Sequence, residues 1–406
     1  MGLALVAVPS AAFADVSLLD KNNGTLTVGG YARTALMVQD SHRLGLSELI
    51  NPEPTSGQSV GVVRLEWTSS IGERVTLDIH QRLSWRTPQT SGLAAQLGLG
   101  ATAEPVRTVD LSTNIVSDES LLLAHDIDRL AARLYLNRVD LYIGRQAITW
   151  GNALMLPSTD LWSRFAQFEL DTTEKPGVDA VRALAGVSDS TELEFVIVDR
   201  GAAEDVSGGV RATVYLDRSD VYVYAAKHWD ALGVGGGFAR DLDTVSLRLD
   251  VHQPVPLAFD ERDTAPLPRA TLGVDHFRSK WNVSGELHFN GAGAGDSDEY
   301  VQSAIESPEY ERGEIQLLGT AYAGILWGYR PVEPISFSLL GLVNLLDPSA
   351  VLAPSMMWTP MQDVELGIGG YIPIGAAPNT SGLLPQARSE FGNLPNSVYF
   401  QMAAYY

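Results

Sequence analysis

The chain of 406 residues contains no cysteine, so no disulfide bond can hold its fold together. It also lacks a run of about 20 apolar residues, which excludes a membrane-spanning helix. Lysine and arginine number only 28 against 49 aspartates and glutamates, and so acidic a chain is not expected to bind nucleic acid. Stability must therefore come from a packed core or from the closure of a sheet.

Motifs for catalysis are missing as well. The sequence contains no H-E-x-x-H, no G-x-S-x-G and no phosphate-binding loop. The histidines are scattered, and His80, His252 and His288 are interpreted as polar strand residues rather than as metal ligands. We therefore expect no catalytic residue, no metal site and no cofactor.

The chain shows instead a pattern that repeats every second residue. From Val245 to His252, and again from Trp281 to Phe289, apolar and polar residues alternate one by one. Such alternation places successive side chains on opposite faces of a sheet. The pattern recurs between turns along almost the whole chain and predicts an all-β protein. A soluble sandwich would show it too, so the alternation alone does not decide the architecture.

The connections between the strands favour a barrel. Tight turns, as at Asn137–Arg138, alternate in strict order with long loops, as at 150–176. This order is typical of a transmembrane antiparallel up-and-down β-barrel with short periplasmic turns and long outer loops. We expect about 18 strands, 16 being possible, of roughly 9–11 residues each. They should begin near Thr25, Ser59, Glu73, Asp128, Val139, Gly177, Thr191, Ser207, Ser219, Leu232, Thr244, Arg269, Lys280, Gly319, Pro334, Ala350, Asp363 and Asn396.

Both ends of the chain point to export. Gly2 to Phe13 is apolar and is followed by Ala14, which fits a signal-peptide cleavage site, so we expect residual signal peptide over 1–14 and one barrel domain over 15–406. A buried N-terminal helix is the alternative. The segment Ser397–Tyr406 is an amphipathic strand ending on an aromatic residue, and it resembles the signal read by the barrel-assembly machinery. The expected location is the outer membrane of a Gram-negative bacterium, in contact with its lipid and lipopolysaccharide.

The alternation also predicts which side chains face the lumen. The first strands contribute mostly arginines and the later ones mostly carboxylates. Two interpretations remain open: a lattice of salt bridges, or a transverse field that acts on polar solutes in the pore. The expected lumen-lining residues are Arg33, Arg64, Arg82, Arg129, Arg133, Arg182, Arg211, Arg248, Glu66, Asp78, Asp140, Glu286, Tyr135, Tyr142 and Tyr222.

One long loop is too apolar for an ordinary outer loop. The segment Trp150–Phe168 is rich in aromatic and aliphatic residues, which favours burial over exposure to water. We expect it to fold into the lumen as a plug or constriction; a lid packed over the rim is the alternative. Ser158 or Asp160 could cap a short helix over Leu161–Phe168. The expected constriction residues are Trp150, Pro157, Asp160, Trp162, Phe165 and Phe168.

Three short stretches around this loop carry a resemblance to a known family. They are Ile143–Gly151, Pro157–Asp160 and Glu174–Arg182, with the patterns G-R-Q…W-G, P-S-T-D and E-K-P-G-V-D. The block resembles the strand–loop–strand block of outer-membrane porins related to the alginate-export type. The resemblance implies a pore, and within that class a conduit for a secreted polysaccharide, with periplasmic polysaccharide-export proteins as further partners.

Other functions remain open beside the conduit. The first alternative is a diffusion porin for small anionic or amphipathic solutes. The second is a barrel that transports nothing and serves as a surface adhesin or scaffold. An outer-membrane enzyme would need a Ser/His or Asp/His set near the rim, and no such set is evident in the sequence.

Overall fold

The structure, a computed structural model, describes residues 16–21, 24–44, 54–87, 106–165, 173–256, 266–380 and 386–406; for 16–21 it describes the backbone alone. The expected signal peptide, 1–14, lies outside the described residues. The strands are β1 Val16–Lys21, β2 Gly24–Asp40, β3 Thr55–Ile71, β4 Val75–Arg86, β5 Ser112–Ser117, β6 Leu122–Leu136, β7 Val139–Gln146, β8 Val178–Ser188, β9 Thr191–Val198, β10 Ser207–Leu216, β11 Ser219–His228, β12 Ala231–Leu242, β13 Val245–Pro256, β14 Arg269–Phe277, β15 Trp281–Asn290, β16 Ala321–Val332, β17 Ile335–Asn344, β18 Ser349–Met361, β19 Val364–Ile374 and β20 Asn396–Tyr405. The helices are η1 His42–Leu44, η2 Ser297–Glu299, α2 Tyr300–Glu306, α3 Pro308–Glu311 and η3 Phe391–Asn393.

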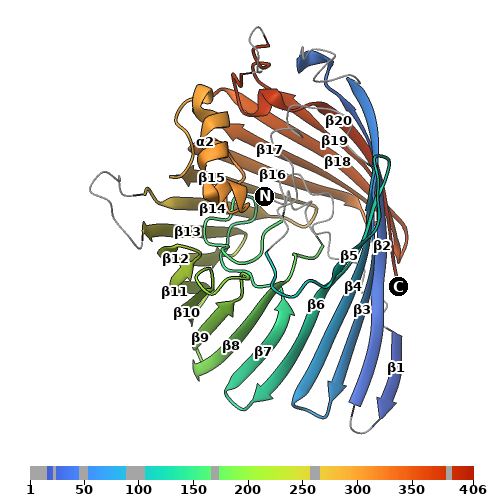
Figure 1. The fold of residues 1–406 in the computed structure, drawn as a ribbon, viewed down its shortest axis with the longest axis vertical. Helices are drawn as coiled ribbons and strands as arrows, with labels where there is room; N and C mark the ends of the chain where they lie inside the picture. The colour runs from blue at the N-terminus through green and yellow to red at the C-terminus, as the bar shows by residue number, and fades with distance from the viewer. Residues whose placement is uncertain are drawn as a thin grey trace.

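The sheet closes on itself. Each strand pairs antiparallel with its neighbour, and β20 returns to β2 with a register that runs from Tyr31 opposite Tyr405 to Asp40 opposite Asn396. Figure 1 shows β20 beside β2 at this seam. Because β1 pairs only with β2, and β5 only with β6, these two strands lie outside the ring. The expected fold class is confirmed: a closed antiparallel barrel of 18 strands.

The predicted strand starts are close to the observed ones, with one clear exception. Strand β6 begins at Leu122 and not near Asp128. The reason is a register shift opposite His80 and Gln81, where β6 carries one extra residue and the alternation breaks. The flanking strands β1 and β5 and the helices α2 and α3 were not predicted.

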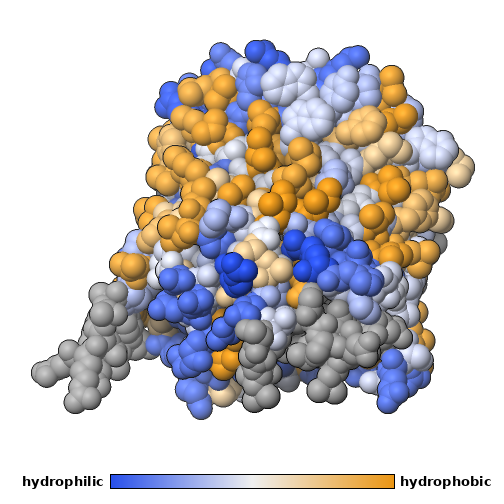
Figure 2. All heavy atoms as spheres, turned by 90° about the horizontal axis from the view of Figure 1, so that it is seen from above, coloured by the Kyte–Doolittle hydropathy of each residue, from blue (hydrophilic) through white to orange (hydrophobic). Residues whose placement is uncertain are grey.

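The outward face of the barrel is apolar. Leu36, Ile197 and Val223 are each more than half exposed, as expected for side chains that face a bilayer rather than a core. Figure 2 shows a broad apolar band on one side of the molecule, with polar side chains gathered above and below it. Trp281 and Trp358 are outward-facing and lie near strand ends, as in an aromatic girdle, whereas Trp229 instead lies in a loop between two guanidinium groups.

No helix in the described segments is long and apolar enough to cross a membrane.

The two ends of the barrel differ. Tight turns, such as Asn137–Arg138 with Asn137 at a φ of 45°, join the strands at one end, called here the turn end. The long connections lie at the other, called here the loop end. The connection from β7 to β8 does not stay at the loop end but passes inside the ring of strands (Figure 1).

Candidate functional site

The infolded segment, residues 150–165, is held by carboxylates of the barrel wall. Glu286 on β15 accepts hydrogen bonds from the backbone N–H groups of Leu154, Met155 and Leu156, at 2.6, 3.0 and 2.9 Å. Asp250 on β13 accepts from the two N–H groups that precede them, at 2.7 and 2.8 Å. Charged acceptors make the stronger class of hydrogen bond. These two carboxylates therefore serve as anchors for the segment.

This bonding explains why the expected short helix is absent. Over 161–165, the described part of the predicted Leu161–Phe168, the backbone is irregular, and Phe168 itself lies outside the described residues. Asp160 does not cap a helix, because its carboxylate pairs with Lys175. Ser158 bonds to Thr271 on β14 at 2.6 Å instead. Since wall side chains satisfy the polar groups of the segment, helical hydrogen bonds are not required.

Apolar packing seals the segment against two parts of the wall. On one side Trp150 and Trp162 lie edge to face with ring centroids 5.0 Å apart, and Trp150 also contacts Tyr224. On the other side Met155 and Leu156 join a cluster with residues of β16 to β18. Inward glycines leave room for this contact: a Cβ at Gly324 would lie 3.2 Å from the sulfur of Met155. The segment thus lies inside the barrel, and the alternative of a rim lid is not what the structure shows.

The predicted constriction residues lie in two environments. Trp150, Asp160 and Trp162 are almost fully buried, whereas Pro157 and Phe165 are only partly covered. Burial raises the pKa of the Asp160 carboxyl, against the opposing effect of the charge on Lys175.

Most of the predicted lumenal arginines are paired with carboxylates. Arg64 lies 2.6 Å from Glu66 and 2.7 Å from Asp128, and its side chain is only 2% exposed. The remaining pairs repeat this arrangement around the wall. They are Arg129 with Asp128 and Glu174, Arg133 with Asp78, Arg182 and Arg211 with Glu194, and Arg248 with Asp275 and Glu286.

Some of these cations nevertheless remain open to the lumen. The side chain of Arg133 is 42% exposed and that of Arg182 is 20% exposed. Both guanidinium groups lie over the ring of Tyr142, at 5.7 and 5.6 Å from its centroid. Arg82 stands opposite Arg64 in the register of β3 and β4, and no carboxylate of the described segments pairs with it. We call Arg82, Arg133, Arg182 and Tyr142 the open arginine cluster.

The other predicted lumenal residues share the same inward face. Arg33 donates to the Tyr405 hydroxyl at 3.1 Å. Tyr135 and Asp140 are opposite one another in the pairing of β6 with β7. Tyr222 is buried beneath the infolded segment, where its hydroxyl donates to Asp250 at 2.7 Å. The predicted arginine-rich and carboxylate-rich sides of the lumen therefore differ in exposure. The infolded segment covers the carboxylates that hold it, whereas some arginines remain partly exposed.

Several functional residues were not predicted. Arg145 bridges β7 and β8 through Asp179, with one bond of 2.8 Å and one of 3.2 Å. Arg164 and Arg269 line a common cavity, and Glu390, between β19 and β20, accepts hydrogen bonds from Leu318, Tyr322 and Asn344. Arg145 and Asp179 both fall in the motif block, which was the one available signal. The described residues contain no group of histidine, aspartate and glutamate side chains arranged to hold a metal ion.

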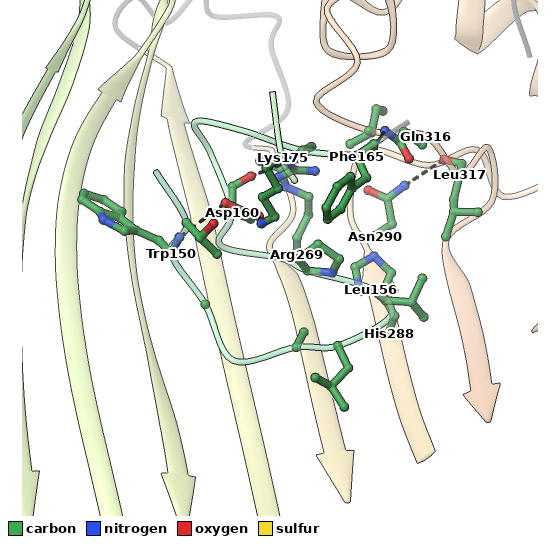
Figure 3. Close-up of a pocket in the computed structure, with 17 residues that line it drawn as sticks. Trp150, Leu156, Asp160, Phe165, Lys175, Arg269, His288, Asn290, Gln316 and Leu317 are labelled. Carbon is green, nitrogen blue, oxygen red and sulfur yellow. Dashed lines mark hydrogen bonds and ion pairs between the residues drawn. The ribbon is translucent and has the colours of Figure 1, made fainter. Parts of the chain in front are cut away.

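A cavity of about 180 Å³ lies beside the infolded segment. Figure 3 shows Asp160, Phe165, Arg269, His288 and Asn290 around it. Residues 315–317, from the loop between β15 and β16, complete the lining. The cavity is thus bounded by one infolded segment, two wall strands and one outer loop.

Comparisons with known proteins show similarity of fold. No protein-family model matches the chain, and no curated protein matches it in sequence. Among solved structures, Acinetobacter baumannii OccAB3 superposes with a TM-score of 0.57 at 10% identity, over 94% of this chain and 99% of that one. Pseudomonas aeruginosa OccK11 (OpdR) gives 0.51 at 8%, over 93% and 96%. Pseudomonas aeruginosa OccD3 (OpdP) gives 0.51 at 9%, over 93% and 91%. At such low identity these similarities establish the barrel fold and not a family.

Proposed function

We propose that this chain is a diffusion channel of the bacterial outer membrane for small anionic solutes, and not an enzyme. The observation that carries the proposal is the open arginine cluster on a barrel wall that the infolded segment leaves uncovered. The apolar outer band supports placement in a bilayer, and the similarity to Occ barrels supports the channel class.

The geometry of the cluster favours an attraction for anions. Arg133 is paired with Asp78 on one side, yet its side chain keeps 42% of its surface exposed. Arg82 has no carboxylate partner within the described residues. Cations at a wall of low dielectric constant concentrate anions in the adjoining water. The pairing reduces this field without removing it, because the partners Asp78 and Glu194 are themselves almost fully covered while the arginines stay partly exposed.

The structure gives little reason to retain the polysaccharide conduit. The motif block that suggested it has a packing role: Arg145 binds Asp179, and a Cβ at Gly144 would lie 2.2 Å from the carbonyl oxygen of Leu130. The motif therefore accounts for the local fold rather than for a substrate. Periplasmic polysaccharide-export partners are expected only for a conduit.

Contacts with the membrane are part of the same proposal. On β20 the side chains of Val398, Phe400 and Met402 all point outward and are 59%, 48% and 43% exposed. We propose that this face meets lipid and lipopolysaccharide in the finished barrel. The same face would be available to the barrel-assembly machinery before the seam with β2 closes.

The experiment is a selectivity measurement in planar bilayers under a salt gradient. The triple variant Arg82→Gln, Arg133→Gln, Arg182→Gln should shift the reversal potential toward cation preference. Arg278→Gln removes an exposed arginine of a tight turn and is the matched control for charge at the channel mouth. A wild-type protein that forms no channel, or a triple variant that conducts with unchanged selectivity, would refute the proposal.

A further inference from the structure

The cavity beside the infolded segment contains an imbalance of charge. Its lining includes three cations, Arg164, Lys175 and Arg269, and one carboxylate, Asp160. Lys175 and Asp160 form an ion pair with each other. Neither guanidinium group forms an ion pair within the described residues, although carboxylates such as Glu314 act on both at longer range.

Arg269 is the more deeply placed of the two. It is only 6% exposed, and within the described residues its one hydrogen bond is a long contact of 3.5 Å to the backbone carbonyl of Glu314. The Glu314 carboxylate is engaged elsewhere, 2.7 Å from Arg312 and 3.3 Å from His228. No carboxylate of the described segments lies within 4.0 Å of Arg269. Arg269 thus receives only the longer-range attraction of Glu314, and a buried cation without a direct partner is unfavourable.

Arg164 approaches the same cavity from the infolded segment. Its guanidinium donates to the carbonyl oxygens of Asp160 and Glu314, which are neutral acceptors. Burial, together with the nearby charge of Arg269, lowers the pKa of Arg164 to about 10. Arg164 is partly buried and Arg269 is buried, and both guanidinium groups line the same cavity.

We propose that a small oxyanion, a phosphate or carboxylate group, binds in this cavity between Arg164 and Arg269 and ties the infolded segment to β14. Guanidinium groups bind such oxygens through paired N–H donors. The cavity of about 180 Å³ is large enough to admit a small anion. Leu156 and Leu317 add apolar surface to the lining, and a charge attracts an anion more strongly beside such surface than in bulk water.

In this proposal the bound anion is a structural ligand and not a transported solute. It neutralises a site that joins the infolded segment, a wall strand and the outer loop that carries Glu314. The site is separate from the open arginine cluster, because strands β9 to β13 lie between β8 and β14. The inference therefore does not depend on the proposed transport function.

The test uses the full-length barrel in detergent, in a buffer whose anion is a bulky sulfonate at low concentration. Titration calorimetry and thermal unfolding are followed while sodium phosphate or sodium butyrate is added, with sodium chloride as the ionic-strength control. We expect one saturable site per chain and a rise in melting temperature with ligand concentration. Preference between phosphate and butyrate identifies the chemical source of the oxyanion.

Variants assign the binding to the site. Arg269→Gln and Arg164→Gln should each weaken binding at least about tenfold, whereas Arg240→Gln, at an exposed position near the end of β12, should not change it. If Arg269→Gln fails to form a heat-modifiable barrel, Arg164→Gln decides alone. The proposal is overturned if neither phosphate nor butyrate binds the wild type, or if binding survives unchanged in the folded variants.

Discussion

The Nη1 atom of Arg248 lies 2.9 Å from Oε1 of Glu286, although the two residues stand on β13 and β15 with β14 between them. The same carboxylate receives three backbone N–H groups of the infolded segment. A wall ion pair and a loop anchor are therefore one structure. The inward-facing carboxylate of Glu286 thus positions the segment that narrows the lumen.

Replacement of that anchor should loosen the infolded segment. Glu286→Gln keeps one carbonyl oxygen but removes the negative charge that three N–H groups and Arg248 share. We expect the free energy of unfolding to fall by about 2–4 kcal/mol, with a larger and noisier single-channel conductance. Heat or urea unfolding and bilayer recording on the same preparation check this. Glu73→Gln, in an exposed tight turn, is the control; equal behaviour of the two variants would contradict the anchor.

Arg64 and Arg82 are adjacent on β3 and β4 but should behave differently. Arg64→Gln leaves Glu66 without its arginine and Asp128 with only the longer contact to Arg129, so we expect a loss of stability of about 3–5 kcal/mol if the site is dry, and less where water enters. Arg82→Gln removes a like charge opposite Arg64 and should not destabilise the barrel. It should shift ion selectivity toward cations instead. Unfolding midpoints and reversal potentials of both variants check this. If Arg82→Gln lost stability and Arg64→Gln shifted selectivity, exposure would not decide which arginine stabilises the barrel and which attracts anions.

The strands were predictable because their determinants are local. Starts at Val139, Thr191, Ser207 and Ser219 were predicted at the residues where β7, β9, β10 and β11 begin. Three of them follow a tight turn, Ser207 follows the connection 199–206, and the alternation that follows each start is set by neighbours in sequence. Strands β1 and β5 were missed because they pair outside the ring, along extra lengths of β2 and β6. The extra residue at Asp128 disturbs the pattern that would have placed the start of β6.

The inward face was predictable, but its pairing was not. Strand parity placed Arg64 inward, whereas its partner Asp128 is 64 residues away and depends on the bulge in β6. Likewise, the apolar composition of 150–168 predicted an infolded segment. The carboxylates that hold it lie far along the chain, Asp250 at 97–98 residues and Glu286 at 130–132 residues from the groups they bind. The predicted helix does not form, because the polar groups of the segment bind side chains that are distant in sequence instead of making local helical hydrogen bonds.

Gly144, in the motif block around the β7–β8 connection, offers a test of the packing role of that block. Gly144 has a φ of +115°, and a Cβ there would lie 2.2 Å from the carbonyl oxygen of Leu130. Gly144→Ala should therefore cost about 2 kcal/mol or more in unfolding free energy. Gly186→Ala is the matched control, since a Cβ there meets no atom within 4 Å. Unchanged thermal stability of Gly144→Ala would mean that the strand adapts at this point.

The loop end of the barrel should become less stable as pH rises through neutrality. Glu390 is buried and accepts hydrogen bonds from the Tyr322 hydroxyl, the Asn344 amide and the Leu318 N–H. Burial raises its pKa to about 7 from an ordinary value of 4.5, with Asp347 adding to the rise. The folded protein therefore binds a proton that the unfolded chain releases. The resulting stabilisation is complete below pH 4.5 and is lost as pH rises from 4.5 through 7.

At about 1.4 kcal/mol per unit of pKa difference, this loss amounts to about 3 kcal/mol. The melting temperature of the wild type should fall between pH 5 and 7.5, and Glu390→Gln should flatten that slope. Glu306→Gln, at an exposed position on α2, should retain it. Glu314 acts in a different window: although burial alone would raise its pKa, contacts with His228 and Arg312 hold it at about 2, so its contribution is lost only below pH 4.5. A wild-type slope that persists in Glu390→Gln would assign the effect to other groups.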